Sequence, residues 1–446
     1  MRKFNAFDIS DSSMFMRKLL NWSRASKHIC ILNSNDYRNV FTTSRAHHEF
    51  DVIAAIGAID EFRPEGDKCL PSLNKFLEDR GDWVFGHLSY DLKNEIENLV
   101  SQLPDKIKFP VVSFFVPQFI FIITNQKLKV GWHDKFNSED DIIKIVKEIH
   151  TLPPSVPGST FSGKVEETTS RAEYFNALRK IKTHIQRGDI YEVNFCHEFF
   201  SREARINAPE TWLALIGESP TPFSCYYRLK DKYLLCASPE RFLKKSGNLI
   251  VSQPIKGTSP RGLTQEEDSS LSFKLGHNPK EIAENIMITD LVRNDLSKIA
   301  LRSSVTVEEL CEIYPFPGVY QMQSTISAKL GRETCFTDVI RASFPMGSMT
   351  GAPKVRAMEI IEQYEKSKRG LYSGAVGYIT PEMDFDFNVV IRSIQYNQAG
   401  SCLSFMVGGA ITGLSEPENE YQESLIKARA IMKVLNHPPP RIKVSG

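Results

Sequence analysis

Hydrophobic residues recur every three to four positions in several segments of the chain, which is the spacing of an amphipathic helix. Residues 140–150 show this spacing clearly. Ser170 and Glu173 form a capping box that starts a second helix, which Gly188 ends. We predict two further helices over residues 280–300 and 417–435.

Apolar and aromatic runs of strand length lie between these helices. Strands follow strands as often as they follow helices. This order favours an α+β fold of mixed, largely antiparallel sheets flanked by helices over a doubly wound fold. The predicted strands are residues 83–90, 111–123 (divided in two by Pro117), 127–132, 190–200, 223–229, 233–237, 249–251, 373–379, 387–395 and 401–411.

A segment rich in proline, glycine and serine at residues 152–159 is typical of a linker. We therefore predict two domains. Residues 1–150 form an N-terminal region with few motifs, and residues 160–436 form the domain with the candidate chemistry. The tail at 437–440 is predicted to be frayed.

Composition excludes several classes of partner. The chain has 446 residues and a formal net charge of +1, so we expect neither nucleic acid nor an anionic membrane as a partner. No apolar run approaches the ~18 residues that span a bilayer, and the first residues soon turn polar. The eight cysteines are scattered, which favours reduced thiols over disulfides or a zinc site. We expect a soluble, cytoplasmic protein.

A lysine stands alone in the stretch Pro-Ile-Lys-Gly-Thr at 254–258. Lys256 comes just after a predicted strand, where the fold can direct its side chain into a cavity, although a surface lysine on a loop is the simpler interpretation. Glu240 also follows a predicted strand, in a Ser-Pro-Glu motif, and could be a positioned acid.

Two pairs of glutamates share one spacing. Glu281 and Glu284 are three residues apart on one predicted helix, as are Glu420 and Glu423 on another. This spacing places both members of a pair on one helix face. A single pair is usually a solvated face, but two facing pairs would need a cation, and oxygen ligands without His or Cys suit Mg²⁺.

Two glycine-rich stretches and one arginine could bind an anion. Residues 344–354 lead into a predicted helix and offer backbone N–H groups to a carboxylate or phosphate. Gly408 and Gly409 allow a close approach to the backbone. Arg392, predicted to lie on a strand, provides the two-pronged donor that a carboxylate prefers, or else forms an ion pair with the neighbouring acids.

In combination these stretches resemble the chorismate-utilising enzymes, which include anthranilate synthase component I, aminodeoxychorismate synthase component I and the isochorismate and salicylate synthases. The match runs in order through about residues 170 to 430, whereas the first 150 residues resemble the family only loosely. The matching segments are residues 188–194, 238–240, 254–262, 283–295, 344–358, 374–379, Arg392 and residues 408–423.

Within this family, Pro-Ile-Lys-Gly-Thr is similar to the aminodeoxychorismate synthases, whereas anthranilate synthases have alanine in place of Lys256. The resemblance implies that Lys256 adds to C2 of chorismate while Glu240, as general acid, helps the C4 hydroxyl to leave. Ammonia then enters at C4 and displaces the lysine, giving 4-amino-4-deoxychorismate on the route to 4-aminobenzoate and folate. Such a lysine must be neutral, so we expect its pKa to be lowered.

The resemblance also implies the binding residues. Mg²⁺ would be held by Glu284 and Glu423, with Glu281 and Glu420 completing the cluster. The enolpyruvyl carboxylate would be held by Tyr378, Arg392 and the backbone of Gly408 and Gly409, and Thr350 would line the pocket. Ammonia would come from a separate glutamine amidotransferase subunit.

The chain departs from the family pattern at three positions. Glu192 stands where the ammonia-using members usually have Gln and the isochorismate synthases have Lys. Gln321 stands where many members have a His that is associated with pyruvate elimination. Ala410 replaces a usual glycine. Anthranilate synthesis and a non-catalytic, chorismate-binding paralogue remain the alternatives.

Overall fold

The computed structural model describes residues 1–37, 47–64 and 68–436, so the predicted frayed tail lies outside the described residues. The strands are β1 Arg2–Asp8, β2 His28–Asn33, β3 Val52–Glu61, β4 Val84–Leu88, β5 Val112–Thr124, β6 Lys127–His133, β7 Glu166–Glu167, β8 Glu192–Ser201, β9 Phe223–Leu229, β10 Lys232–Ser238, β11 Arg241–Ser246, β12 Leu249–Gln253, β13 Ile255–Pro260, β14 Thr306–Phe316, β15 Val319–Lys329, β16 Gly351–Ala352, β17 Ala375–Ile379, β18 Phe385–Asn388, β19 Ser393–Asn397 and β20 Cys402–Ile411. The α-helices are α1 Ser12–Trp22, α2 Cys69–Arg80, α3 Lys93–Ile96, α4 Glu139–Thr151, α5 Arg171–Gln186, α6 Ala208–Glu218, α7 Gln265–Gly276, α8 Pro279–Ser297, α9 Phe336–Ser343, α10 Lys354–Tyr364 and α11 Pro417–Val434.

The strands form two arms that meet at the long strand β5. The first arm runs β5–β3–β2–β9–β10–β19–β20–β8, and the second runs β5–β4–β17–β18–β11–β12–β15, with β13 and β14 also paired to β15. Each of these pairs is antiparallel. The predicted α+β fold of largely antiparallel strands with flanking helices is confirmed.

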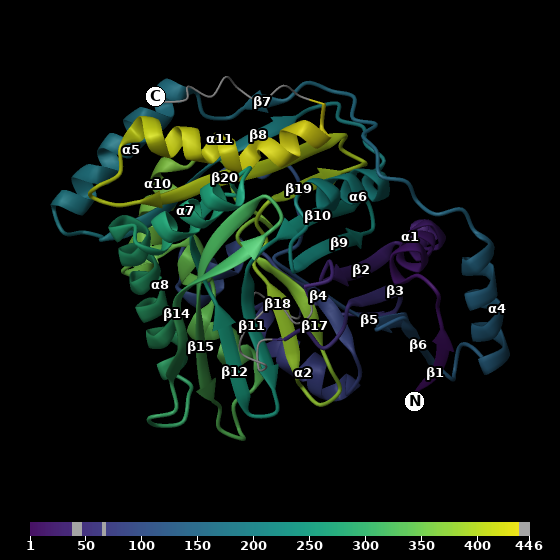
Figure 1. The fold of residues 1–446 in the computed structure, drawn as a ribbon. Coiled ribbons are helices and arrows are strands. Elements are labelled where there is room, and N and C mark those ends of the chain that lie inside the picture. Colours follow the sequence, from purple (N-terminus) through teal and green to yellow (C-terminus); the bar gives the residue numbers. More distant parts are fainter. Residues whose placement is uncertain (38–46, 65–67, 437–446) are drawn as a thin grey trace.

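Apolar residues fill three layers of this fold. One core packs α1, α4, α5, α6, α10 and α11 on the outer face of the first arm, and a second packs α2, α8 and α9 on the second arm. A third core lies between the arms and joins Tyr227 of β9 to Phe85 of β4 and Val376 of β17. Figure 1 shows α11 lying across β8 and β20 and α8 lying along β14 and β15.

The two predicted domains share this hydrogen-bonded framework. Strand β2 pairs with β9, and β4 pairs with β17, so N-terminal strands lie inside both arms. The predicted linker is also tied to the N-terminal helix, since Ser155 N donates to the carbonyl oxygen of Arg17. The domain boundary at residue 150 stays a prediction. Strands from both sides of this boundary pair with each other.

Several predicted elements lie where expected. Helix α4 covers 139–151, and the capping box at the start of α5 has both of its hydrogen bonds, between Ser170 and Glu173. Helices α8 and α11 match the two glutamate-bearing segments within three residues. Strand β9 occupies the predicted residues. These elements form from local periodicity and local caps, which the sequence displays directly.

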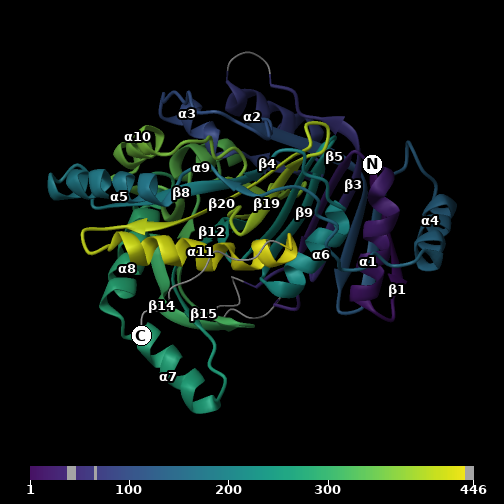
Figure 2. The same cartoon turned by 90° about the horizontal axis from the view of Figure 1, so that it is seen from above.

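Two expectations about local structure were wrong, and one helix was not predicted. Pro117 does not divide a strand, because β5 continues through it and accommodates it at a register shift with β3. Residues 265–276 form helix α7, whose first N–H groups are capped by Thr264 and complemented by acids in the first turn. Arg392 lies between β18 and β19 with φ of 50°. Figure 2, seen from above, shows α7 at the edge of the molecule, below β14 and β15.

Candidate active site

Lys256 is fixed at the start of the short strand β13, directly after β12. Both strands pair with β15, with a register shift in β13 that spans Lys256. On α8, Asn285 Nδ2 lies 3.5 Å from the carbonyl oxygen of Lys256 and 3.3 Å from that of Met322. The backbone of the lysine is therefore held by a strand on one side and by a helix on the other.

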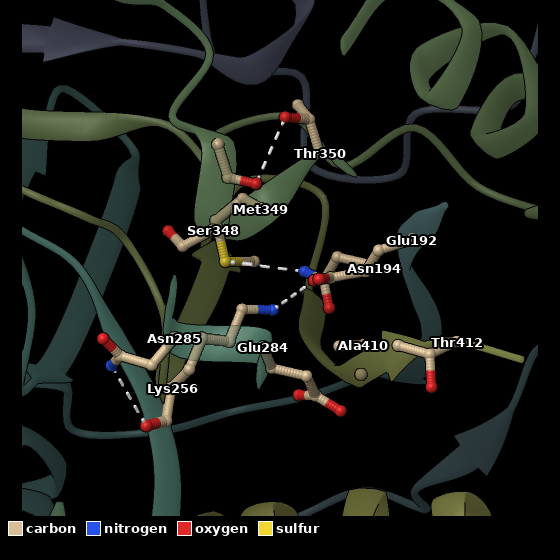
Figure 3. A network of polar contacts seen from close by, with 12 residues as sticks. Glu192, Asn194, Lys256, Glu284, Asn285, Ser348, Met349, Thr350, Ala410 and Thr412 are labelled. Carbon is tan, nitrogen blue, oxygen red and sulfur yellow. Dashed lines mark hydrogen bonds and ion pairs between the residues drawn. The ribbon is translucent and has the colours of Figure 1, made fainter. Parts of the chain in front are cut away.

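The amino group of Lys256 lies among carboxyl groups. Its Nζ lies 2.8 Å from Oε1 of Glu192, and the side chains are 10% and 1% exposed, respectively. Figure 3 shows this contact, with Glu284 beside it. Burial lowers the pKa of Lys256, but the charges of Glu192, Glu284 and Glu240 outweigh it and hold the pKa above its ordinary value. The expectation of a lowered pKa is therefore wrong for this arrangement, in which Lys256 is a cation.

Glu240 is the second buried titratable group near the lysine. It lies in the turn between β10 and β11 and is 3% exposed. Oε1 accepts a hydrogen bond of 2.6 Å from Ser348 Oγ, which is supplied by the glycine-rich loop. Burial raises the pKa of Glu240 to about 7, against the opposing effects of Ser348 and Lys256. Glu240 is thus able to carry a proton near neutral pH.

The two glutamate pairs face each other across the gap between α8 and α11. Lys280 lies between them, 3.0 Å from Glu420 Oε1 and 3.7 Å from Glu284 Oε1. Burial raises the pKa of Glu284 to about 7, and burial followed by repulsion from Glu423 raises that of Glu281. The helices thus bring four predicted ligands into one region that carries an excess of negative charge.

This carboxylate cluster suits a hard divalent cation in its chemistry. Its donors are oxygens alone, and Glu284 Oε1 accepts no hydrogen bond from any described residue. No group of three acidic, His or Cys side chains in the described ranges is close enough to form a ready-made metal centre. A lysine, Lys280, supplies the positive charge between the helices, while Glu423 is paired with Lys427 at 2.7 Å.

Arg392 has no hydrogen-bond or ion-pair partner for its side chain among the described residues. Burial lowers its pKa, and Tyr372 and Glu423 are the groups that act on it electrostatically. A part-buried guanidinium without a paired counter-ion is costly, so this position favours an anion.

Gly408 and Gly409 lie on β20, and each lies close to a different part of the structure. A Cβ on Gly408 would lie 2.3 Å from the carbonyl oxygen of Phe195 on β8, so the glycine is required for strand packing. A Cβ on Gly409 would lie 3.6 Å from Glu420 Oε2 and from Glu423 Oε1. Gly409 therefore borders the carboxylate cluster.

One predicted substrate-binding residue, Tyr378, lies away from the other predicted site residues, whereas the role of Thr350 stays a prediction. Tyr378 lies in the core between the arms, against Trp83 and Phe85, because its position on β17 points it to that face. The tyrosine that acts on Arg392 is Tyr372. Thr350 is buried, and its hydroxyl lies 3.2 Å from the carbonyl oxygen of Met346 and 3.3 Å from that of Gly347, both in its own loop.

Sequence reasoning omitted Glu192, Ser348, Asn285 and Tyr372 from the site. The structure brings the first two to Lys256 and Glu240, respectively. The signal for Glu192 was its departure from the usual glutamine, and Ser348 lies inside the glycine-rich loop that was singled out. No local pattern could reveal that these segments meet.

Comparison with known proteins gives a consistent result. The family model described as "chorismate binding enzyme" matches residues 18–433. Aminodeoxychorismate synthase component 1 of Klebsiella aerogenes is 34% identical over 352 residues, which are 79% of this chain and 77% of that protein. Anthranilate synthase component 1 of Thermus thermophilus is 32% identical, covering 79% of this chain and 77% of that protein.

A solved structure shares the fold. Anthranilate synthase component I from Streptococcus pneumoniae superposes with a TM-score of 0.75 at 24% identity, covering 86% of this chain and 91% of the other. Among the described residues no helix has the length and apolarity that crossing a membrane requires.

Proposed function

The chain belongs to the chorismate binding enzyme family, and from this premise we propose that it aminates chorismate at C4 to give 4-amino-4-deoxychorismate. The observation that carries the proposal is a lysine, Lys256, whose side chain is 10% exposed and lies 2.8 Å from the buried carboxylate of Glu192, and which acts electrostatically on the buried Glu240, whose pKa is raised to about 7. The similarity to aminodeoxychorismate synthase component 1 of Klebsiella aerogenes supports the same reaction.

In the proposed reaction Lys256 is the nucleophile and Glu240 is the general acid. The lysine nitrogen bonds to C2 of chorismate, the two conjugated ring double bonds shift to C1=C6 and C4=C5, and the C4–O bond breaks. Glu240 gives its proton to the departing hydroxyl, which leaves as water. Ammonia then bonds to C4 as both double bonds shift back and the C2–N bond to Lys256 breaks. Glu240, now a carboxylate, takes up the excess proton of the new amine.

The substrate's carboxylates are proposed to bind at the two charged ends of the site. Arg392, whose guanidinium has no partner among the described residues, would donate hydrogen bonds to the enolpyruvyl carboxylate. Because Gly409 has no side chain, a substrate group could approach its backbone closely. Glu281, Glu284, Glu420 and Glu423 would hold Mg²⁺, which when bound supplies the positive charge that binds the ring carboxylate.

Ammonia is proposed to come from a separate glutamine amidotransferase subunit, because the candidate site contains no cysteine positioned as the nucleophile of a glutaminase and the Klebsiella aerogenes relative is named as a component 1. The eight cysteines are free, which supports a reducing compartment such as the cytoplasm.

The product of the isolated chain identifies the reaction. Incubation with chorismate, Mg²⁺ and an ammonium salt is expected to give a product that has exchanged a hydroxyl for an amino group and kept the enolpyruvyl group, as read by mass. Fluorescent anthranilate with free pyruvate would instead identify an anthranilate synthase. No Mg²⁺-dependent turnover of chorismate would indicate a non-catalytic paralogue.

Mg²⁺ is expected to raise the thermal unfolding midpoint of the protein, because a ligand that binds only the folded state stabilises it. At a metal concentration of about 100 times its Kd the stabilisation is about 2.7 kcal/mol. Glu284→Gln is expected to lose most of this Mg²⁺-dependent shift. Glu198→Gln, which changes a buried glutamate paired with Lys106 elsewhere, is expected to retain it. Equal shifts in Glu284→Gln and the wild type would rule Glu284 out as a ligand.

A further inference from the structure

Glu192 is the one described residue whose side chain forms a hydrogen bond with the amino group of Lys256. It is the first residue of β8, and its strand position is fixed by pairing with Ala352 of β16. Its side chain is 1% exposed. A rigid strand therefore holds one carboxylate oxygen 2.8 Å from the lysine nitrogen, which is the distance required for direct proton transfer.

Glu192 has one hydrogen-bond partner for its carboxyl group among the described residues. Oε2 is buried and receives no hydrogen bond from any described residue, and the bond with Lys256 is the only one that Oε1 makes there. Among the described residues, Lys256 is therefore the one group that can pass a proton directly to this carboxylate or take one from it.

We infer that Glu192 is a catalytic residue that exchanges a proton with Lys256 during the proposed amination. In the first half-reaction Nζ–H breaks and Glu192 O–H forms, leaving a neutral amine whose electron pair bonds to C2. In the second half-reaction the C2–N bond breaks, the nitrogen keeps the electron pair, and Glu192 returns the proton to it. Glu192 and Lys256 thus end in their initial states, and Glu240 handles the proton at C4 separately.

The other acids around Lys256 are less suited to this exchange. Glu240, from the turn after β10, is bonded to Ser348. Glu281 and Glu284 on α8 and Glu423 on α11 act on the lysine through space, without a hydrogen bond to its nitrogen. An amide at position 192 could hold the lysine in place but could not accept its proton.

This inference rests on the proposed lysine intermediate, so its test measures that intermediate directly. The intact protein is mixed with chorismate and Mg²⁺ without ammonia, and the covalent adduct is followed by mass and mapped to Lys256. We expect Glu192→Gln to form the adduct about 10²–10⁴-fold more slowly than the wild type at pH 7. Glu198→Gln, on the same strand and also paired with a lysine, is expected to match the wild type.

The dependence of adduct formation on pH separates proton exchange from a structural role. In the wild type the proton moves within the Glu192–Lys256 pair, so between pH 6 and 8, roughly, the rate of adduct formation is expected to show only the decrease with pH that follows from Glu240. In Glu192→Gln the lysine must lose its proton to solvent, so the ratio of its rate to the wild-type rate is expected to rise about tenfold per pH unit below the lysine's pKa. Glu192→Asp keeps a carboxylate and is expected to keep the wild-type profile at a lower rate.

Each other result is decisive. A wild-type protein that aminates chorismate without any Lys256 adduct would overturn both the lysine intermediate and this inference. A wild-type adduct that forms equally fast, or faster, in Glu192→Gln would overturn the inference alone. A slow Glu192→Gln variant whose pH profile runs parallel to that of the wild type would assign Glu192 a structural role and overturn the inference as well.

Discussion

Replacing Lys256 by alanine is expected to lower the rate of C4 amination at least about 10³-fold, because the reaction then has no nucleophile for C2. The measurement is the rate of product formation from chorismate, Mg²⁺ and an ammonium salt, with the product identified by mass. Lys256→Arg keeps the charge opposite Glu192 but cannot supply a neutral amine. It is therefore expected to be as inactive as the alanine variant.

A matched control separates this loss from the loss of any lysine–carboxylate contact. Lys245 on β11 is also part-buried and lies 3.0 Å from Asp384. Lys245→Ala is expected to leave the amination rate within about twofold of the wild type, since the partners of Lys245, Met383 and Asp384, lie outside the candidate site. A Lys256→Ala variant that retains a tenth of the wild-type rate would contradict covalent catalysis by this residue.

Replacing Glu240 by glutamine is expected to lower the amination rate about 10²–10⁴-fold, because the C4 hydroxyl then leaves without a proton donor. In the wild type only the protonated form of Glu240 donates. Because the pKa of Glu240 is about 7, the rate is expected to fall as the pH rises through 7. The residual rate of Glu240→Gln is expected to lack this alkaline decrease.

Ser348 gives the same assignment a second test. Its hydroxyl donates to the carboxylate of Glu240 and so lowers the pKa of that group. Ser348→Ala is expected to move the alkaline decrease to higher pH. Ser327 makes a similar 2.6 Å bond to Glu308 on the β14–β15 hairpin, and Ser327→Ala is expected to leave the pH profile unchanged. An unshifted profile in Ser348→Ala would remove Glu240 as the group that titrates.

The sequence predicts those parts of the fold that are determined locally. Helices α4 and α5 each have a capping box and an apolar stripe, and both features depend on residues within one or two turns. Helix α7 lacks such a stripe and has one fully buried residue, Leu275. The only local signals of this helix are its N-terminal cap and the acids of its first turn. A search for hydrophobic periodicity does not detect these signals.

The candidate site could be predicted as a set of residues but not as an arrangement. The resemblance selects Lys256, Glu240 and the glutamate pairs. The ion pair between Lys256 and Glu192 joins strands that are far apart in the sequence, and it reverses the expected direction of the lysine's pKa shift. Tyr378 was selected by the resemblance, and its place in the core between the arms depends on which face of β17 it occupies, which the sequence alone does not give.

The strand pairing that crosses the predicted boundary has a consequence for how the chain is made. Strand β4 is synthesised early, but its partner β17 ends at Ile379, close to the C-terminus. Strand β2 similarly cannot pair with β9 until residues 223–229 have been synthesised. The N-terminal strands therefore leave the ribosome with unpaired edges and apolar faces, and folding is expected to be slow because its contacts are distant in sequence. Truncated chains that end before β17 should accordingly require chaperones or aggregate.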